Sequence, residues 1–389
     1  MKYNFDEIID RSTTNTVKFG GLESSFGHKD LIPLWVADMD FKSPPCIAKA
    51  LEERVRHGIF GYTRPGNAYY DSIVNWLKNR HQWAVEKDWI TFVPGVVKGF
   101  TFVIDAFTEK GDGIIIQPPV YHPFRLATEA LGRVVVNNQL VLDDGRYNID
   151  FEDFEKSIKE NNCKLFIFSN PHNPGGRVWT RDELARLSEI CAKNKVLVVS
   201  DEIHSDLALY GNKHIPFASV SQEAADNSIT LMAPSKTFNI AGIVSSFAVT
   251  SNEKIRARYL KFLEPRELNQ GTIFAYTATV AAYEEGGEWL DQLLDYIQGN
   301  IDFVDNYLKK NIPTVKAMLP EASFLVWLDC RELKLPQAQL VKLFVDEAGL
   351  ALNNGTMFGP GGEGFMRLNV GSPRSVLEKA LENLKKAIK

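Results

Sequence analysis

Short apolar runs recur through the middle of the chain and alternate with amphipathic stretches. The runs at residues 114–116, 164–168, 196–199 and 229–233 contain few polar side chains. Strands that are apolar on both faces are typical of a parallel sheet with helices on each side. The segments between them suit helices, and residues 180–183 form a capping-box motif at the start of one such helix. The pattern therefore predicts an α/β fold with a mostly parallel central sheet.

The pattern changes on either side of this central part. The first segment is punctuated by proline and has no regular period, which predicts an irregular arm packed on the rest of the molecule. Towards the carboxyl end, long amphipathic helices and two short apolar runs predict a smaller α+β domain. We expect an N-terminal arm over residues 1–47 that packs with the small domain, a large domain over 48–285 and a small domain over 286–389.

Composition and charge exclude several classes of protein. The chain has 389 residues, of which 44% are hydrophobic and 24% charged, as is ordinary for a globular protein. A net charge of −5 argues against nucleic acid or an anionic membrane surface as the main partner. The acidic N-terminus and the lack of a long apolar run argue against a signal peptide or a membrane span, so we expect a cytoplasmic protein. The four scattered cysteines and the histidine spacing predict no metal site.

Four side chains that could take part in binding or catalysis follow four consecutive predicted strands. In chain order they are Tyr121, Asn173, Asp201 and Lys236. Because parallel strands end at the same edge of a sheet, we expect these four side chains to converge on one crevice. Burial at such a position lowers the pKa of a lysine, and a neutral amine is a usable nucleophile or base.

The sequence around these residues resembles a known family. The informative stretches are Ala233-Pro234-Ser235-Lys236-Thr237-Phe238-Asn239, Ser200-Asp201-Glu202-Ile203-His204, Gly61-Tyr62-Thr63 and Trp35-Val36-Ala37-Asp38-Met39-Asp40-Phe41. They resemble fold-type I pyridoxal 5′-phosphate (PLP) enzymes of the aspartate aminotransferase superfamily. The resemblance is stronger to the MalY/PatB group of cystathionine β-lyases, which are C–S lyases, and extends over nearly the full chain. It implies the fold of PLP-dependent transferases and PLP as the cofactor.

The resemblance implies a role for each of the four residues. Lys236 would form a Schiff base with PLP and, once the substrate displaces it, take the Cα proton. Asp201 would lie at the pyridine nitrogen, where an anion keeps the ring protonated and able to accept electrons. Tyr121 would stack on the ring. Asn173 would donate a hydrogen bond to the ring 3-oxygen and help to hold the substrate carboxylate.

The resemblance also implies a phosphate site. Val96 and Val97 follow a glycine turn and open a predicted helix, whose free N–H groups and dipole favour a dianion. Ser235 would add a hydroxyl group. Tyr62 is similar to the tyrosine that reaches the phosphate of the neighbouring subunit, which implies a homodimer with shared active sites.

The resemblance also implies residues that bind the substrate, and the chain departs from the aminotransferase pattern at two positions. Arg367 matches the arginine that binds the substrate α-carboxylate, and Ala37 of the arm is expected to line the substrate pocket. Val244 stands where aminotransferases carry an arginine that pairs with the phosphate; Lys98 is either a replacement for that charge or an exposed lysine. His204 stands where they carry a tyrosine near the 3-oxygen, and it is either a cofactor contact or a packed residue. Both departures favour the lyase group.

Three functions remain open from the sequence. The first is a cysteine-S-conjugate or cystathionine β-lyase, which carries out an α,β-elimination that gives a thiol, pyruvate and ammonia. Thiolates leave readily without a strong acid, so such thioethers suit a site specialised in elimination. The second is a class I/II aminotransferase. The third is a regulator that binds a protein partner, as proteins resembling this group can do.

Overall fold

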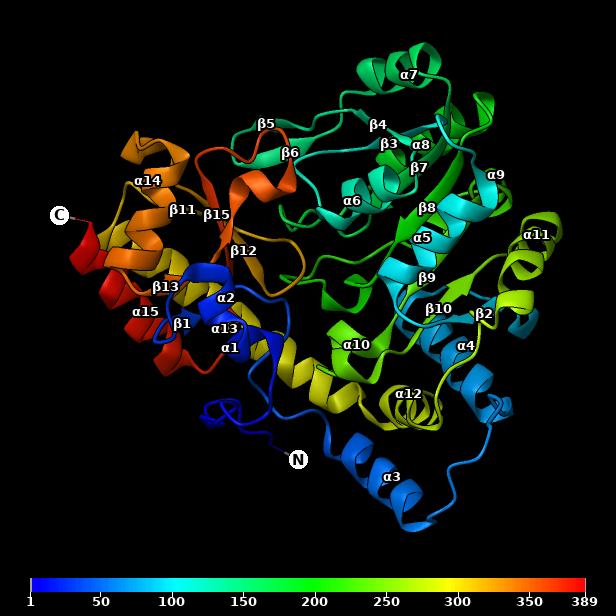
Figure 1. Cartoon of the computed structure of the whole chain (residues 1–389), viewed down its shortest axis with the longest axis horizontal. Coiled ribbons are helices and arrows are strands. Elements are labelled where there is room, and N and C mark those ends of the chain that lie inside the picture. The colour runs from blue at the N-terminus through cyan, green and yellow to red at the C-terminus, as the bar shows by residue number, and fades with distance from the viewer. Residues whose placement is uncertain (1, 389) are drawn as a thin grey trace.

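A seven-stranded sheet with the order β2-β10-β9-β8-β7-β3-β4 occupies the centre of the molecule, as the computed structural model shows for residues 2–388 (Figure 1). Strand β10 runs antiparallel to both of its neighbours, and the other pairs are parallel. The prediction of a mostly parallel central sheet is therefore confirmed. The strands are β2 (Ile90–Val93), β3 (Gly113–Ile116), β4 (Val134–Asn137), β7 (Cys163–Ser169), β8 (Leu197–Asp201), β9 (Ser228–Met232) and β10 (Ser246–Val249).

Helices cover both faces of this sheet. Ile167 of β7 packs in the cluster that includes helix α5 (Val96–Phe107). The next residue, Phe168, packs on the opposite face, in the cluster that includes α7 (Phe151–Glu160) and α8 (Arg181–Lys193). Successive side chains of a strand point to opposite faces, so a sheet covered on both sides needs apolar residues at every position. This requirement explains the near-continuous apolar runs.

The remaining helices lie before, between and after these strands along the chain. The capping box at the start of α8 is present, with the Thr180 hydroxyl accepting from the Glu183 N–H and the Glu183 carboxylate accepting from the Thr180 N–H. The other main helices are α3 (Pro45–Arg56), α4 (Asn67–His81), α6 (Pro123–Ala130), α9 (Gln222–Asp226), α10 (Pro234–Thr237), α11 (Glu253–Leu263), α12 (Ile273–Glu285), α13 (Gly287–Asn311), α14 (Gln337–Lys342) and α15 (Arg374–Ala387).

A second, four-stranded antiparallel sheet forms the core of the C-terminal part, in the order β11-β12-β15-β14. We propose that the small domain begins near residue 286, and this separate sheet supports the division. Its strands are β11 (Lys316–Met318), β12 (Leu325–Asp329), β14 (Asn353–Asn354) and β15 (Phe365–Asn369).

Helix α13 connects the two parts of the chain. It has 25 residues and runs from α12, beside the large sheet, to the C-terminal elements (Figure 1). Its buried face carries apolar residues such as Leu293 and Val304, whereas its other face is polar. Over the part of the chain that the structure describes, none of the helices combines the length and apolar character that a membrane span needs.

The N-terminal arm is more regular than the sequence predicted. Residues 1–47 were expected to be irregular, but they include α1 (Val17–Gly20), α2 (Leu22–Phe26) and β1 (Ile32–Pro33), and that expectation was wrong. Strand β1 pairs in parallel with β13 (Leu350–Ala351). These elements are too short for a hydrophobic period to be visible, and such short helices depend on tertiary contacts.

Four charged side chains anchor the arm. Lys18 is fully buried, and its ammonium group lies 2.8 Å from an Asp40 carboxylate oxygen. The Arg11 guanidinium bridges Asp40 at 2.6 Å and Asp38 at 2.8 Å. Asp40 also accepts a hydrogen bond from the Ser372 hydroxyl, 2.6 Å away. This cluster, which we call the arm cluster, ties the segment around Asp38 to the C-terminal part of the molecule.

Replacing Lys18 by methionine should lower the free energy of unfolding by about 3 kcal/mol, because it leaves two enclosed carboxylates with one cation between them. Lys29→Met is the matched control, since the Lys29–Glu23 pair is exposed and such pairs contribute about 0–1 kcal/mol. Urea unfolding followed by tryptophan fluorescence measures both. Equal destabilisation by the two variants would contradict an anchoring role for the arm cluster.

Candidate active site

A cavity of about 340 Å³ lies where β3, β7, β8 and β9 end. The four strands are neighbours in the sheet, so the segments that follow them meet at one edge, as predicted. The residues predicted from the sequence that line this cavity are Ala37, Val96, Val97, Tyr121, Asn173, Asp201, His204, Ser235 and Lys236. Other lining residues include Gly95, Lys98, Ser169, Ile203, Val244 and Ser245.

The amine of Lys236 is enclosed in this cavity. It donates a hydrogen bond of 2.5 Å to the backbone carbonyl of Ala37, which comes from the arm. Burial lowers the pKa of Lys236 to about 8; the charge of Arg367 acts in the same direction, and Asp38 and Asp201 oppose it. A substantial fraction of this amine is therefore neutral near pH 8 and available as a nucleophile or a base.

Asp201 is the last residue of β8 and is buried. Burial raises the pKa of Asp201 to about 7; the Ile203 N–H, whose nitrogen lies 3.2 Å from the carboxylate, and the nearby Lys236 lower it, whereas Glu202 raises it. A carboxyl group with this pKa ionises readily when a positive group lies beside it. Asp201 is suited to pair with a protonated ring nitrogen.

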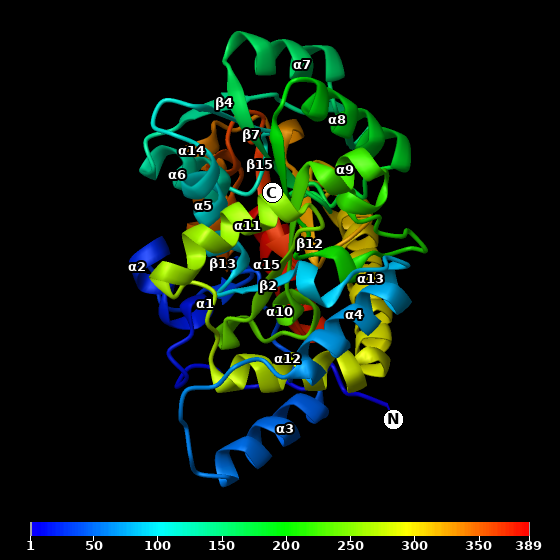
Figure 2. The same ribbon diagram turned by 90° about the vertical axis from the view of Figure 1, so that its right-hand side faces the viewer.

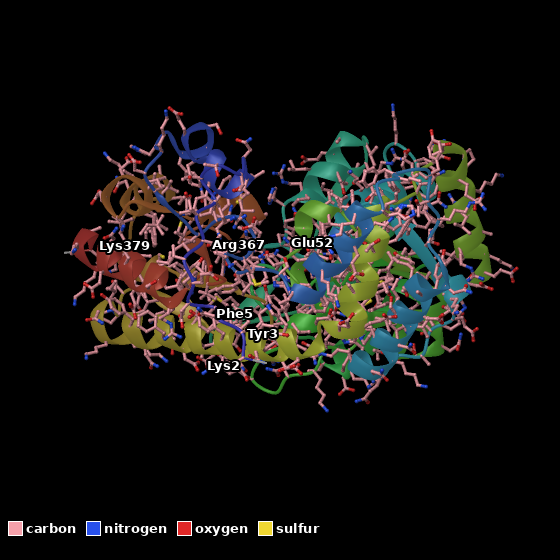
Figure 3. The ribbon with its side chains drawn as sticks, turned by 90° about the horizontal axis from the view of Figure 1, so that it is seen from below. Lys2, Tyr3, Phe5, Glu52, Arg367 and Lys379 are labelled. Carbon is pink, nitrogen blue, oxygen red and sulfur yellow. The ribbon has the colours of Figure 1, made fainter. Side chains whose placement is uncertain are left out.

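Arg367 lies on β15 and is buried. Figure 3 labels it in the interior of the view, beside the C-terminal elements. Its guanidinium donates to the side-chain oxygens of Asn173 at 3.0 Å and Asn353 at 2.6 Å, and to the Trp35 carbonyl at 3.1 Å. Within residues 2–388 its buried Nε has no hydrogen-bond partner and no carboxylate pairs with it, and burial lowers the pKa of Arg367 to about 10. An enclosed arginine without an anionic partner is suited to bind a carboxylate ligand.

The N-terminus of α5 forms one wall of the cavity. The turn before it needs glycine, because Gly95 has a φ of 107°. The N–H group of Gly95 donates a hydrogen bond of 2.7 Å to the Ser246 hydroxyl. In the described part of the chain, no side chain caps α5 and its first turn contains no acidic residue. With Val96 and Val97 at its start, this helix end is suited to bind a phosphate group.

Val244 faces the same cavity with a strained backbone. Its φ of 57° lies in the left-handed region, which is unfavourable for a β-branched residue. Its side chain is partly exposed, and so is that of Lys98, which also lines the cavity. No fixed cation is therefore held at this end of the cavity by the residues that the structure describes.

Tyr121 and His204 also line the cavity. Burial raises the pKa of Tyr121, so its hydroxyl group stays protonated at neutral pH. Burial lowers the pKa of His204 to about 3, and the charges of Lys236 and Arg367 contribute, so the imidazole is neutral. Its buried Nδ1 has no hydrogen-bond partner among residues 2–388. His204 thus faces the site, which favours a ligand contact over simple packing.

Two predicted residues do not line the cavity: Arg367, which adjoins it through Asn173, and Tyr62, which lies outside it in a single chain. Tyr62 lies on the loop between α3 and α4 and is fully exposed. The exposed apolar residues Ile59 and Phe60 lie on the same loop. Figure 2 shows α3 and this loop extending away from the rest of the molecule.

Two buried histidine–carboxylate pairs lie behind the site, and the sequence analysis missed them. His214 lies 2.7 Å from Glu202, which follows Asp201, and His81 lies 2.8 Å from Asp206. The two imidazole rings meet edge to face, with centroids 5.4 Å apart. Because the paired residues lie 12 and 125 positions apart and form no motif, only the folded chain reveals their pairing. Asn353, the partner of Arg367, was missed for the same reason.

Residues 29–384 match the sequence model of a family described as aminotransferase class I and II. The chain belongs to this family. The match includes Ala37 and Arg367, so it spans the whole of the candidate site. It confirms the superfamily that the motifs around Lys236 indicated.

Individual relatives show which members of this family the chain resembles. The chain is 46% identical to cystathionine beta-lyase PatB of Bacillus subtilis over 385 residues, which are 99% of this chain and 100% of that protein. Cystalysin of Treponema denticola, whose structure contains a pyridoxal 5′-phosphate cofactor, superposes with a TM-score of 0.97 at 38% identity, over 100% of this chain and 99% of that one. The PLP-bound C-S lyase of Staphylococcus hominis gives a TM-score of 0.93 at 36% identity, over 100% and 98%. The predicted fold and the resemblance to the PatB group are confirmed.

The residues of the cavity fit PLP. The uncapped end of α5 and Ser235 suit its phosphate, and Asp201 suits its ring nitrogen. Lys236 supplies the amine for its aldehyde, and Tyr121 supplies an aromatic surface for its ring. The cavity thus offers a positive helix end for the phosphate, a carboxyl group for the ring nitrogen and an amine for the aldehyde.

The rate at which cofactor-free protein couples PLP to Lys236 should rise with pH and level off above about pH 8. Only the neutral amine attacks an aldehyde, and the pKa of Lys236 is about 8. Below that value the neutral fraction falls about tenfold per pH unit. Stopped-flow absorbance over a pH series measures the rate, with Lys236→Ala as the control that does not couple. A rate that keeps rising up to about pH 10.4, as for an exposed lysine, would contradict the enclosed site.

Proposed function

We propose that this protein is a PLP-dependent cysteine-S-conjugate β-lyase that acts on cystathionine and related thioethers. The products are a thiol, pyruvate and ammonia. The observation that carries the proposal is the 46% identity to cystathionine beta-lyase PatB over the full length of that protein. The cavity supports it, because an amine and a carboxyl group line it and a buried arginine, Arg367, donates to its lining residue Asn173.

Elimination is favoured over amino transfer by the phosphate end of the cavity. Val244 stands where aminotransferases of this superfamily carry a phosphate-pairing arginine, and its side chain lines the cavity. The phosphate would depend instead on the end of α5, on Ser235 and on a residue from a second subunit. Amino transfer is the alternative that the assay below tests.

The binding of substrate depends on Arg367 and Asn173. Arg367 offers N–H groups on an enclosed guanidinium to the α-carboxylate, and the 3.0 Å hydrogen bond to Asn173 orients it. The Ala37 carbonyl lies next to the Lys236 amine and bounds the substrate pocket from the arm side. Bound in this way, the substrate would have its Cα–H bond within the cavity that contains Lys236.

Lys236 then acts as the base. When bound, PLP supplies an aldehyde carbon for the substrate amine and a ring that accepts the electron pair left at Cα. Asp201 carries the negative charge that keeps the ring nitrogen protonated. Lys236 would take the Cα proton, the electron pair of the Cα–H bond would form a Cα–Cβ double bond, and the thiolate would leave with the electron pair of the Cβ–S bond. The three-carbon fragment that remains is hydrolysed to pyruvate and ammonia.

The function also implies a homodimer with shared sites. Tyr62, which is fully exposed and outside the cavity of its own chain, would reach the phosphate in the partner's site. Ile59 and Phe60 on the same loop would be covered by that contact. The cytoplasmic location and the regulatory protein partner stay predictions.

Incubation of the purified protein with L-cystathionine should release pyruvate and a thiol in equal amounts. Lactate dehydrogenase coupling measures the pyruvate, and a thiol reagent measures the second product. Lys236→Ala should reduce the rate by at least about 1,000-fold, because it removes both the cofactor's amine and the base. Amino exchange driven by a keto acid, without pyruvate or thiol release, would overturn the proposal in favour of an aminotransferase.

A mixture of two inactive variants tests the shared site. Lys236→Ala and Tyr62→Ala chains, unfolded together and refolded, form mixed dimers in which one site has both substitutions and the other has neither. Lyase activity should therefore reappear well above that of either variant refolded alone. A mixture that stays as inactive as its components, although sedimentation shows dimers, would mean that Tyr62 serves its own chain.

A further inference from the structure

Asp206 lies behind the cavity and joins three parts of the fold. Its Oδ1 accepts hydrogen bonds from the His81 imidazole at 2.8 Å and from the Trp76 indole at 2.9 Å. Its Oδ2 accepts one from the Thr237 hydroxyl at 2.8 Å. We propose that Asp206 is a positioning residue that fixes Lys236 relative to Asp201. This inference rests on the proposed function, which assigns Lys236 and Asp201 their roles.

The helix that carries Lys236 cannot hold its own position. Helix α10 has four residues, Pro234–Thr237, and the side chain of its N-cap residue, Ala233, makes no capping hydrogen bond. One turn of helix is unstable alone, because the first hydrogen bond is formed at a large entropic cost. Thr237 follows Lys236 directly and is fully buried, so its hydrogen bond to Asp206 is placed to hold this turn.

The same carboxylate belongs to the segment that carries Asp201. Asp206 lies on the turn Ser205–Leu207, shortly after the end of β8. Strands β8 and β9 are paired up to Asp201 and Leu231. Beyond these residues, the two segments of the chain are no longer paired as strands. The hydrogen bond between Asp206 and Thr237 connects them again, on the far side of the candidate catalytic groups.

Helix α4 gives this connection a rigid base. Trp76 and His81 both lie on α4, and Trp76 stacks on Tyr283 of α12 with ring centroids 5.0 Å apart. The groups that face Asp206 are thus His81, Trp76 and Thr237, with His214 and its partner Glu202 beyond His81. Burial acts to raise the pKa of Asp206, but the three hydrogen bonds and the charge of His81 outweigh it, so its pKa is lowered. Asp206 is therefore an ionised acceptor for all three donors.

Substitution of Thr237 separates positioning from folding. Thr237→Val removes the hydroxyl group and keeps the shape, whereas Thr237→Ser keeps the hydroxyl group. In cofactor-free protein, Thr237→Val should raise the pH midpoint of PLP coupling by about half a unit or more, because a displaced Lys236 is less enclosed. In the holoenzyme it should lower kcat for cystathionine about tenfold and change KM less than about twofold. Thr237→Ser should stay within about twofold of the wild type in both assays.

Asp206→Asn gives a second test, with Asp305→Asn as its matched control. Asp305 is also a mostly buried carboxylate, but it lies on α13 and pairs with Lys309 at 2.6 Å. Asp206→Asn should shift the coupling midpoint in the same direction as Thr237→Val, and Asp305→Asn should not shift it. If Asp206→Asn does not fold, Thr237→Val decides the question.

Two results would overturn the inference. One is a folded Thr237→Val protein whose midpoint and kcat match those of Thr237→Ser. The other is an equal midpoint shift in Asp305→Asn, which would indicate general loosening of the fold. The coupling assay needs no substrate, so a wild type without lyase activity but with the expected midpoint shift in Thr237→Val refutes the proposed function and leaves the positioning role supported.

Discussion

The structure depends on the enclosure of two cations, Lys236 in the cavity and Arg367 beside its lining residue Asn173, neither of which contacts a carboxylate among residues 2–388. Lys236 donates to the Ala37 carbonyl, and Arg367 donates to two asparagine side chains and a carbonyl. Neutral acceptors satisfy the hydrogen-bonding needs of the cations but leave their charges uncompensated, which lowers the pKa of both groups. A ligand with a carboxylate and a phosphate supplies the missing negative charge. The same buried and uncompensated positive charge therefore favours the binding of an anionic ligand and lowers the pKa of the Lys236 amine.

Holding this arrangement requires rigid support from outside the cavity. The arm cluster holds the segment that contains Ala37, with fully buried Lys18 paired to Asp40. On the opposite side, Asp206 connects the turn after β8 to the short helix of Lys236. Both supports are buried charged groups that bridge segments distant in sequence. Charge inside a protein is costly unless it is paired, so these contacts have a well-defined geometry.

One departure from the aminotransferase pattern, Val244, concerns the proposed phosphate end of the cavity. With Val244 in place of an arginine, the phosphate end has a helix terminus and small polar groups instead of a fixed cation. The exposed loop of Tyr62 adds a further group only if a second chain is present. The proposed cofactor end of the site would thus depend partly on an exposed loop of a second chain, whereas Arg367, which we propose binds the substrate, is buried within one chain.

The sequence by itself predicted four adjacent strands of the central sheet, β3, β7, β8 and β9, and the cavity residues that follow them. Apolar runs identify strands buried on both faces, and the carboxyl edge of a parallel sheet is where Asn173, Asp201 and Lys236 must gather. Tertiary structure alone decided the short helices of the arm and the contacts of Asp206 and Asn353. Their partners are distant in sequence, and a hydrogen bond between two buried side chains leaves no periodic pattern in the chain. Hydrophobic periodicity records which face of an element is buried, but not which polar group lies opposite.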